Sequence, residues 1–154
     1  MAMEWRDKPE FSTYIDLVGI VERWDPKGLR KDMDPEAAEK MLHLLFEATL
    51  AGFGLLKVSV GRRTIMEQER LYGLGRTGGV LYAQGIDPLM ADSGHAQVTW
   101  VLPSKSKHIV GRAWDLDITS YGGVHLNRLG RIANHLGITW GGHWRKKDYA
   151  HFEL

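Results

Sequence analysis

The sequence predicts an α+β fold, with a small, mainly antiparallel sheet and flanking helices. Two segments have apolar residues at helical spacing, a third begins with a helix-capping pattern, and short apolar segments that suit β-strands lie between and after them. The order of these elements favours a single α+β domain. The chain contains no internal repeat and no low-complexity segment that would indicate another architecture.

The composition fits one globular domain and limits its partners. Of 154 residues, 44% are hydrophobic, which is enough for a core. A net charge of +1 argues against broad nucleic-acid binding and against a polybasic membrane anchor. No stretch approaches the ~18 consecutive apolar residues of a membrane span. The chain has no cysteine, so a metal site must use nitrogen and oxygen ligands.

The first 33 residues show no clear period and are rich in charges and turn formers. We expect residues 1–33 to form an extended arm packed on a single domain of residues 34–154. Met1–Pro9 has acids and bases where a signal peptide needs an apolar core. We therefore expect synthesis in the cytoplasm without a signal peptide.

The first helix is predicted from Asp34, a good N-cap, and Pro35, which suits the first helical position. Gly52 and Gly54 end it, and residues 55–60 are predicted to form a strand. The buried face of this helix is expected to hold Ala38, Met41, Leu42, Leu45 and Ala48.

The middle of the chain begins with a capping-box pattern, Thr64 to Glu67, that starts a helix running to about Leu74. Residues 75–104 are interrupted by glycines and prolines. We expect this long irregular stretch to be a functional loop.

The last third of the chain is predicted to supply three strands and a helix. Residues 113–118 alternate, which places Asp115 and Asp117 on one face. A helix over residues 126–136 and strands over 138–140 and 150–153 complete the expected elements. If the strands that contain Asp115 and His151 are neighbours, the two side chains can meet across the sheet.

Two imidazoles and a carboxylate can hold a zinc ion and leave a fourth position open. His108, Asp115 and His151 are the candidates, and Asp148 lies close enough in sequence to accept a proton from the attacking water. Spacing alone is a weak signal, because a structural or solvent role is the ordinary reading of a histidine. That reading is expected for His43, His95, His125 and His135. Asp117 is expected to support the ligands or to be solvated.

Three segments carry a resemblance to a known family. They are Ser106-x-His108-x-x-Gly111-x-Ala113-x-Asp115, then Gly61-Arg62-Arg63-Thr64-x-x-x-Gln68-x-x-Leu71-Tyr72, and the C-terminal Trp140–Trp144 with Asp148–Leu154. Together they resemble the zinc D-Ala-D-Ala carboxypeptidase and L-alanyl-D-glutamate endopeptidase family, which shares the hedgehog fold. The resemblance is greatest to phage endolysin peptidases and covers roughly residues 35–154.

The resemblance implies zinc on His108, Asp115 and His151, with Asp148 as general base and acid. It also assigns Arg63 to the substrate or to developing negative charge. Gln68 and Ser106 match positions that line the site. For Arg63 an ion pair at the helix start, and for Ser106 a loop-stabilising hydroxyl, are the alternatives.

The sequence departs from the family at two positions. His143 stands where many relatives have Asp, and Ala150 stands where they often have Pro. His143 is therefore either a polar group at the rim of the site or a competing ligand. Trp140 and Trp144 can form a cleft wall or belong to the core. The basic run Arg145–Lys147 is either a solvated turn or an aid to capture of an anionic cell wall.

The function expected from the resemblance is hydrolysis of a peptidoglycan stem peptide, most simply between L-Ala and D-Glu, by a phage or prophage endolysin that acts on the cell wall after release. A D,D-carboxypeptidase or dipeptidase acting on D-Ala-D-Ala is the alternative within the same chemistry. A zinc-stabilised binding domain without catalysis is the alternative from another class, and Asp148 argues against it. We expect a monomer with no nucleic-acid partner and no membrane anchor.

Overall fold

The computed structural model describes residues 17–154, with no side-chain description for residues 17 and 18. The chain divides into two compact units. One consists of the residues up to Arg62 together with Gly111–Leu154, and the other is Arg63–Val110. Among the described residues, no helix combines the length and hydrophobicity needed to cross a membrane.

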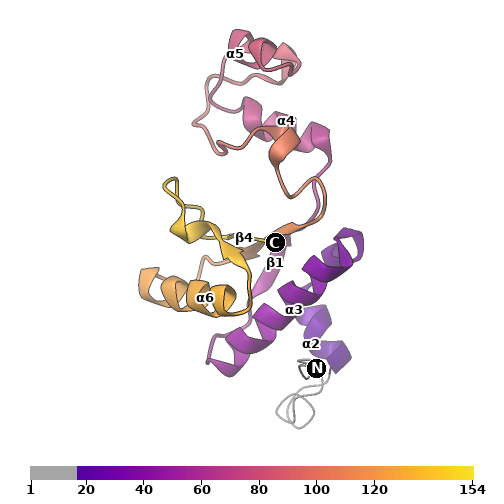
Figure 1. Cartoon of the computed structure of the whole chain (residues 1–154), viewed down its shortest axis with the longest axis vertical. Helices are drawn as coiled ribbons and strands as arrows, with labels where there is room; N and C mark the ends of the chain where they lie inside the picture. Colours follow the sequence, from indigo (N-terminus) through magenta and orange to yellow (C-terminus); the bar gives the residue numbers. More distant parts are fainter. Residues whose placement is uncertain (1–16) are drawn as a thin grey trace. The chain divides into compact units, whose positions relative to one another are not determined.

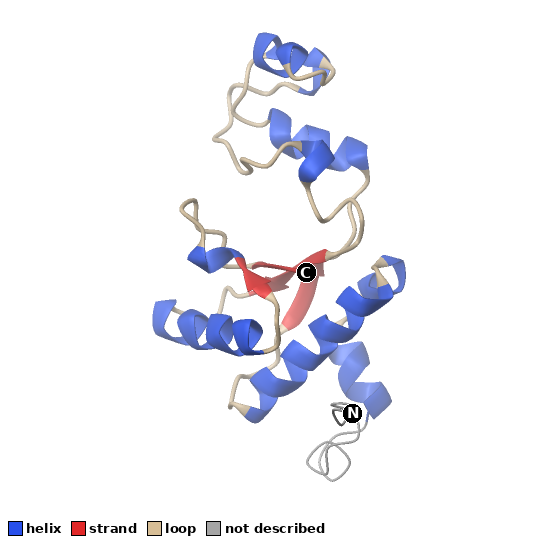
Figure 2. Ribbon diagram, in the orientation of Figure 1, coloured by secondary structure: helices blue, strands red, loops and turns tan. Residues whose placement is uncertain are grey.

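The first unit contains a four-stranded antiparallel sheet, as the sequence predicts (Figure 2). Its strands are β1 (Lys57–Val60), β2 (Ala113–Asp117), β3 (Thr139–Trp140) and β4 (His151–Glu153), in the spatial order β1-β2-β4-β3. Strand β2 therefore lies between β1, which precedes it in the chain, and β4, which follows it.

The register between β2 and β4 sorts their side chains by face. Trp114 pairs with Phe152 and Asp115 pairs with His151. Trp114 and Phe152 are buried and their rings stack with centroids 6.2 Å apart. Because successive side chains of a strand point to opposite faces, Asp115 and His151 lie on the other face. The predicted meeting of these two residues across the sheet is confirmed.

Helices α3 (Pro35–Leu50) and α6 (Gly123–His135) pack on the face that carries Trp114 (Figure 1). As predicted, Asp34 caps α3 by accepting a hydrogen bond from the backbone N of Ala37 at 3.1 Å. Helix α6 approaches the sheet closely, because a Cβ on Gly130 would lie 2.0 Å from the Trp140 ring. The apolar side chains of both helices and of the sheet form one core.

The N-terminal segment differs from the expected extended arm. Residues 1–16 lie outside the described part, but residues 17–33 contain helix α2 (Leu17–Trp24) and the 3₁₀ helix η2 (Leu29–Asp32). Trp24 belongs to the main core, and the buried carboxylate of Asp25 accepts backbone hydrogen bonds from the start of η2. Residues 17–33 are thus helical rather than extended, because burial of the apolar face of α2 stabilises a helix that is short by itself.

The second unit is mainly helical. Helix α4 (Ile65–Gly73) begins with the predicted capping box, in which Thr64 and Glu67 exchange hydrogen bonds of 2.7 and 3.2 Å. Residues 75–104 are less irregular than predicted, because helix α5 (Gly78–Ala83) lies within them. The short 3₁₀ helices are η3 (Pro88–Met90) and η4 (Pro103–Lys105). A small core of Tyr72, Leu81 and Ile86 explains why α5 is stable.

Candidate metal centre

The centre is built on the pairing of β2 with β4. Asp115 and His151 are directly opposite in the register, and Nδ1 of His151 lies 3.3 Å from Oδ1 of Asp115. Their side chains are 15% and 9% exposed, so the ion pair is largely shielded from water. A short η5 helix (Gly141–His143) and the turn that follows it precede β4.

The second ring nitrogen of His151 is also engaged. Its Nε2 lies 2.8 Å from Oε2 of Glu153, two residues along the same strand. Burial by itself lowers the pKa of His151, but the hydrogen bonds and charges of Asp115 and Glu153 outweigh burial and raise that pKa to about 9. A metal ion that binds Nδ1 must therefore displace the proton that the charged ring directs from Nδ1 to Asp115.

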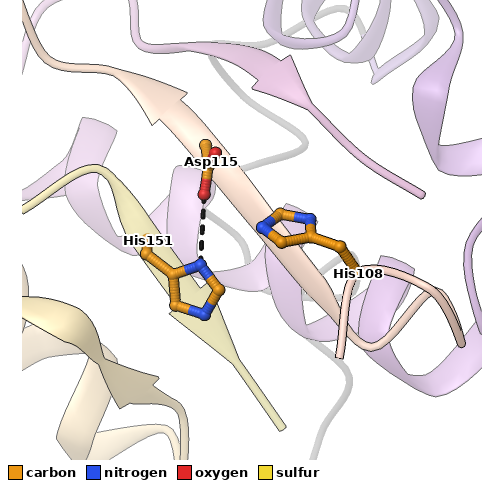
Figure 3. A group of neighbouring side chains, drawn as sticks. All are labelled: His108, Asp115 and His151. Carbon is orange, nitrogen blue, oxygen red and sulfur yellow. Dashed lines mark ion pairs between the residues drawn. The ribbon is translucent and has the colours of Figure 1, made fainter. Parts of the chain in front are cut away.

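His108 completes a group of three side chains. The residue is 3% exposed, and its backbone O accepts a hydrogen bond of 3.0 Å from the backbone N of Arg63. His108, Asp115 and His151 each offer a ligand atom, and these atoms lie within 4.8 Å of one another (Figure 3). Two imidazoles and one carboxylate, all with little exposure, match the donor set of a catalytic zinc site.

The glycine between His108 and Asp115 in the motif is Gly111, and its backbone conformation explains why a glycine stands there. Its φ of 74° is in the left-handed region, and a Cβ there would lie 2.8 Å from the backbone N of Asp34. The backbone O of Gly111 accepts a hydrogen bond from this same N at 3.0 Å. A glycine is therefore required where the chain enters β2.

Asp148 lies in an exposed turn before β4, outside the group of three. The backbone of this turn is tied down, because the N of Asp148 donates to the O of Gly141 at 3.0 Å and the N of His151 donates to the O of Asp148 at 3.3 Å. A Cβ on Gly141 would lie 2.5 Å from the O of Asp148 and 3.2 Å from the Cβ of His151. The absence of a side chain at Gly141 thus lets this turn pack beside His151.

Arg63 and Gln68 are joined at the start of α4. Nη1 of Arg63 donates to Oε1 of Gln68 at 3.3 Å, and Gln68 is only 2% exposed. The amide therefore orients the guanidinium, a role that the sequence analysis did not assign to it. Ser106 is buried, and its backbone O accepts a hydrogen bond from the N of Ile109 in the turn that contains His108.

The packing bears on three other residues with alternative sequence predictions. Trp140 is a core residue, and its Nε1 donates to the O of Tyr149 at 2.9 Å. The Trp144 ring lies against His151, with centroids 4.9 Å apart. His143 is exposed, lies against the Trp140 ring and is not in the group of three, so it is not a competing ligand there.

Asp117 has the solvated role that was one of its two expectations. It is exposed, and its Oδ1 accepts hydrogen bonds from the backbone N and the hydroxyl of Thr119 at 3.1 and 2.7 Å. These bonds lower the pKa of Asp117. Glu153, to which the sequence assigns no role, is a second acid in contact with His151, with Oε2 2.8 Å from Nε2.

Comparison with known proteins agrees with this geometry. Residues 102–154 match a family model described as D-alanyl-D-alanine carboxypeptidase, and this stretch contains all three residues of the group. The chain is also 33% identical over 106 residues to the peptidoglycan L-alanyl-D-glutamate endopeptidase CwlK of Bacillus subtilis (strain 168). Both matches show that the chain is similar to peptidoglycan peptidases of this kind. The alignment covers 63% of this chain and 59% of CwlK, so the chain spans about three fifths of that relative.

Solved structures of peptidases share the fold. The L-Ala D-Glu endopeptidase ChiX of Serratia marcescens superposes with a TM-score of 0.50 at 19% identity, over 87% of this chain and 92% of ChiX. The D,D-pentapeptidase VanY, as an E175A mutant from a VanB-type resistance cassette in complex with Zn(II), gives 0.53 at 20% identity, over 79% and 72%. This fold thus occurs in proteins named for two different cleavage sites.

Proposed function

We propose that this chain is a zinc-dependent peptidase that hydrolyses peptidoglycan stem peptides. The observation that carries the proposal is the group His108, Asp115 and His151, which combines a zinc donor set with burial. The zinc ion supplies a Lewis acid and an activated water at neutral pH. The similarity to D-alanyl-D-alanine carboxypeptidases and to CwlK supports the same reading.

In this proposal Asp148 takes the proton of the attacking water and returns it to the leaving amine. Its position supports the role, because the turn that contains it is hydrogen-bonded beside the ligand His151. Arg63 stabilises the negative charge that develops on the scissile carbonyl, or binds a substrate carboxylate. A guanidinium suits either role, since it stays charged and can donate to two oxygens.

Ser106 and Gln68 are proposed to shape the substrate side of the site. Gln68 acts mainly through Arg63, because its amide oxygen already accepts from that guanidinium. Its burial leaves little surface for a direct contact with substrate. Ser106 is next but one to His108, so its hydroxyl belongs to the same turn as a ligand.

The L-Ala–D-Glu bond is the proposed cleavage site. The observation in favour is the 33% identity to a peptidase named for this bond. The fold alone does not favour either bond, since ChiX and VanY are named for different ones. Cleavage at D-Ala-D-Ala is the second candidate, which the description of the matched family supports.

Digestion of purified peptidoglycan followed by mass analysis of the new termini tests these candidates. Cleavage at the proposed bond exposes a new amino-terminal D-Glu on the released peptides. Carboxypeptidase activity instead releases D-Ala and shortens the stem from its end. If the zinc-loaded protein produces neither change, the chain is a zinc-stabilised binding domain and the enzymatic proposal is wrong.

We further propose that the protein works as a monomeric phage or prophage endolysin that reaches the cell wall after release from the cytoplasm. The extensive resemblance to endolysin peptidases supports this role. Expression in a susceptible host with and without a separate membrane-permeabilising protein tests it. Lysis is expected only when that protein is present, and wall cleavage without lysis would favour a remodelling role.

A further inference from the structure

We propose that Glu153 is a positioning residue that holds the His151 ring with Nε2–H donated to its carboxylate and Nδ1 directed to the metal. The inference rests on the proposed function, because it concerns the same metal centre. It adds a residue that the family resemblance did not assign and names the nitrogen of His151 that binds.

The first argument is that the two ring nitrogens of His151 have different partners. Nε2 lies 2.8 Å from Oε2 of Glu153, and Nδ1 lies 3.3 Å from Oδ1 of Asp115. Asp115 is itself a member of the group of three, whereas Glu153 is not. Figure 3 shows the nitrogen that faces Asp115 and the second nitrogen on the far side of the ring. Only Nδ1 is therefore on the side of the other two ligands.

The second argument is that the sheet places Glu153 with little freedom. Strand β4 lies between β2 and β3, and Glu153 pairs with Ala113 on one side and Thr139 on the other. The alternation of the strand puts the carboxylate on the same face as His151, two residues away. Its side chain is 18% exposed, so water competes weakly for this hydrogen bond.

A carboxylate in this position has two effects on a metal-binding imidazole. It keeps the proton on Nε2, which leaves the lone pair of Nδ1 for the metal, and it increases the basicity of that lone pair. Loss of such a partner typically reduces metal affinity by about 10- to 100-fold. The Trp144 ring at 4.9 Å packs against the same imidazole and limits its rotation.

Substitution of Glu153 tests the inference through zinc affinity, measured by competition with a chelator. Glu153→Ala should lose about 10- to 100-fold in affinity, whereas Glu153→Gln should lose less because its amide oxygen still accepts from Nε2–H. Asp117→Asn is the matched control, since it also removes one carboxylate charge two residues from a proposed ligand, but the hydrogen bonds of Asp117 are to Thr119. Its affinity should stay within about twofold of the wild type, well below the effect of losing a ligand partner.

The binding nitrogen is tested without any substitution. Long-range ¹H–¹⁵N correlation spectra of the zinc-loaded wild type should show His151 with a protonated Nε2 and a metal-bound Nδ1. Zinc on Nε2, or equal zinc affinity of folded Glu153→Ala and the wild type, overturns the inference while the proposed function stands. A wild type that binds no zinc overturns the proposed function itself and the inference with it.

Discussion

At the scale of single residues, the three proposed ligands are held by different local structures. Asp115 and His151 face each other across adjacent strands. His108 lies in a turn, where its backbone O accepts a hydrogen bond from the backbone N of Arg63. The proposed base, Asp148, lies in another turn, outside this group. Substitutions should therefore separate loss of metal from loss of catalysis.

Asp148→Ala should leave the zinc content and the far-ultraviolet circular dichroism unchanged and should reduce kcat by about 10²- to 10⁴-fold, the usual contribution of a general base. Peptide hydrolysis and zinc content are measured on the same preparation. Asp117→Ala, which removes another exposed acid, is the control and should keep near-normal turnover. Near-normal turnover of Asp148→Ala would show that the base is wrongly assigned.

His108→Ala should lose stoichiometric zinc after gel filtration, because the remaining imidazole and carboxylate form an incomplete set. Elemental analysis of the purified variant measures the effect. His143→Ala is the matched control and should retain one zinc ion, since His143 is not in the group of three. One zinc ion per chain in His108→Ala would contradict the ligand assignment.

The raised pKa of His151 predicts that the metal-free protein loses stability at high pH. The pKa is about 9 in the folded state and near 6.5 when unfolded, so the protonated ring stabilises the fold fully below about pH 6.5. This contribution, on the order of 3 kcal/mol, is lost as the pH rises through about 9. Urea unfolding with a chelator present measures it, and Glu153→Gln should show a shallower pH dependence. Equal slopes for the two proteins would contradict the prediction.

At the scale of elements, the approach of the η5 segment to the turn before β4 depends on a glycine. In Gly141→Ala the new Cβ would meet the O of Asp148 at 2.5 Å, so this turn must move. We expect a loss of about 1–3 kcal/mol in the free energy of unfolding, as for other overpacked sites, together with weaker zinc binding. Urea unfolding and zinc titration measure these effects.

Gly123→Ala is the control for this substitution. Gly123 is at the start of α6, and nothing lies within 4 Å of a Cβ placed there. Its stability should be unchanged or slightly higher, because alanine favours a helix. If Gly141→Ala behaves in the same way, the turn is less tightly packed than its distances indicate.

The same scale explains which elements could be predicted. Helices α3 and α4 begin with local signals, the Asp34 cap and the Thr64–Glu67 box, and both starts are confirmed. Helices α2 and α5 were missed because they are short and depend on burial. Trp24 is buried in a core formed by distant parts of the chain, and Leu81 is buried with Tyr72 and Ile86 across intervening turns. Neither short helix is therefore marked by a helical period of its own.

At the scale of the whole molecule, charge is balanced but locally uneven. The net charge is +1, whereas Arg145, Lys146 and Lys147 form an exposed basic turn. Lys147 donates to the O of Gly142 at 2.9 Å, which ties part of this turn to the η5 helix. The turn can attract an anionic polymer without giving the protein a general affinity for polyanions.

This charge distribution predicts that salt affects whole-wall digestion more than hydrolysis of a short soluble peptide. Screening weakens attraction between exposed charges, and a short peptide gains little from that attraction. Turbidity and peptide assays at increasing salt measure the two activities. The double variant Arg145→Ala/Lys146→Ala should remove the difference. Equal salt sensitivity of both activities in the wild type would mean that the turn is merely solvated.

The sequence by itself determined the chemistry available to the chain. The lack of cysteine limits metal ligands to nitrogen and oxygen, strand alternation assigns Asp115 and His151 to one face each, and the motifs indicate the family. Only the tertiary structure decided which strands are neighbours and which atoms meet. Pairing of β2 with β4 joins residues far apart in the chain, and the hydrogen bond between the side chains of His151 and Glu153 depends on their rotamers. Alternation specifies a face, but only packing selects the partner on it.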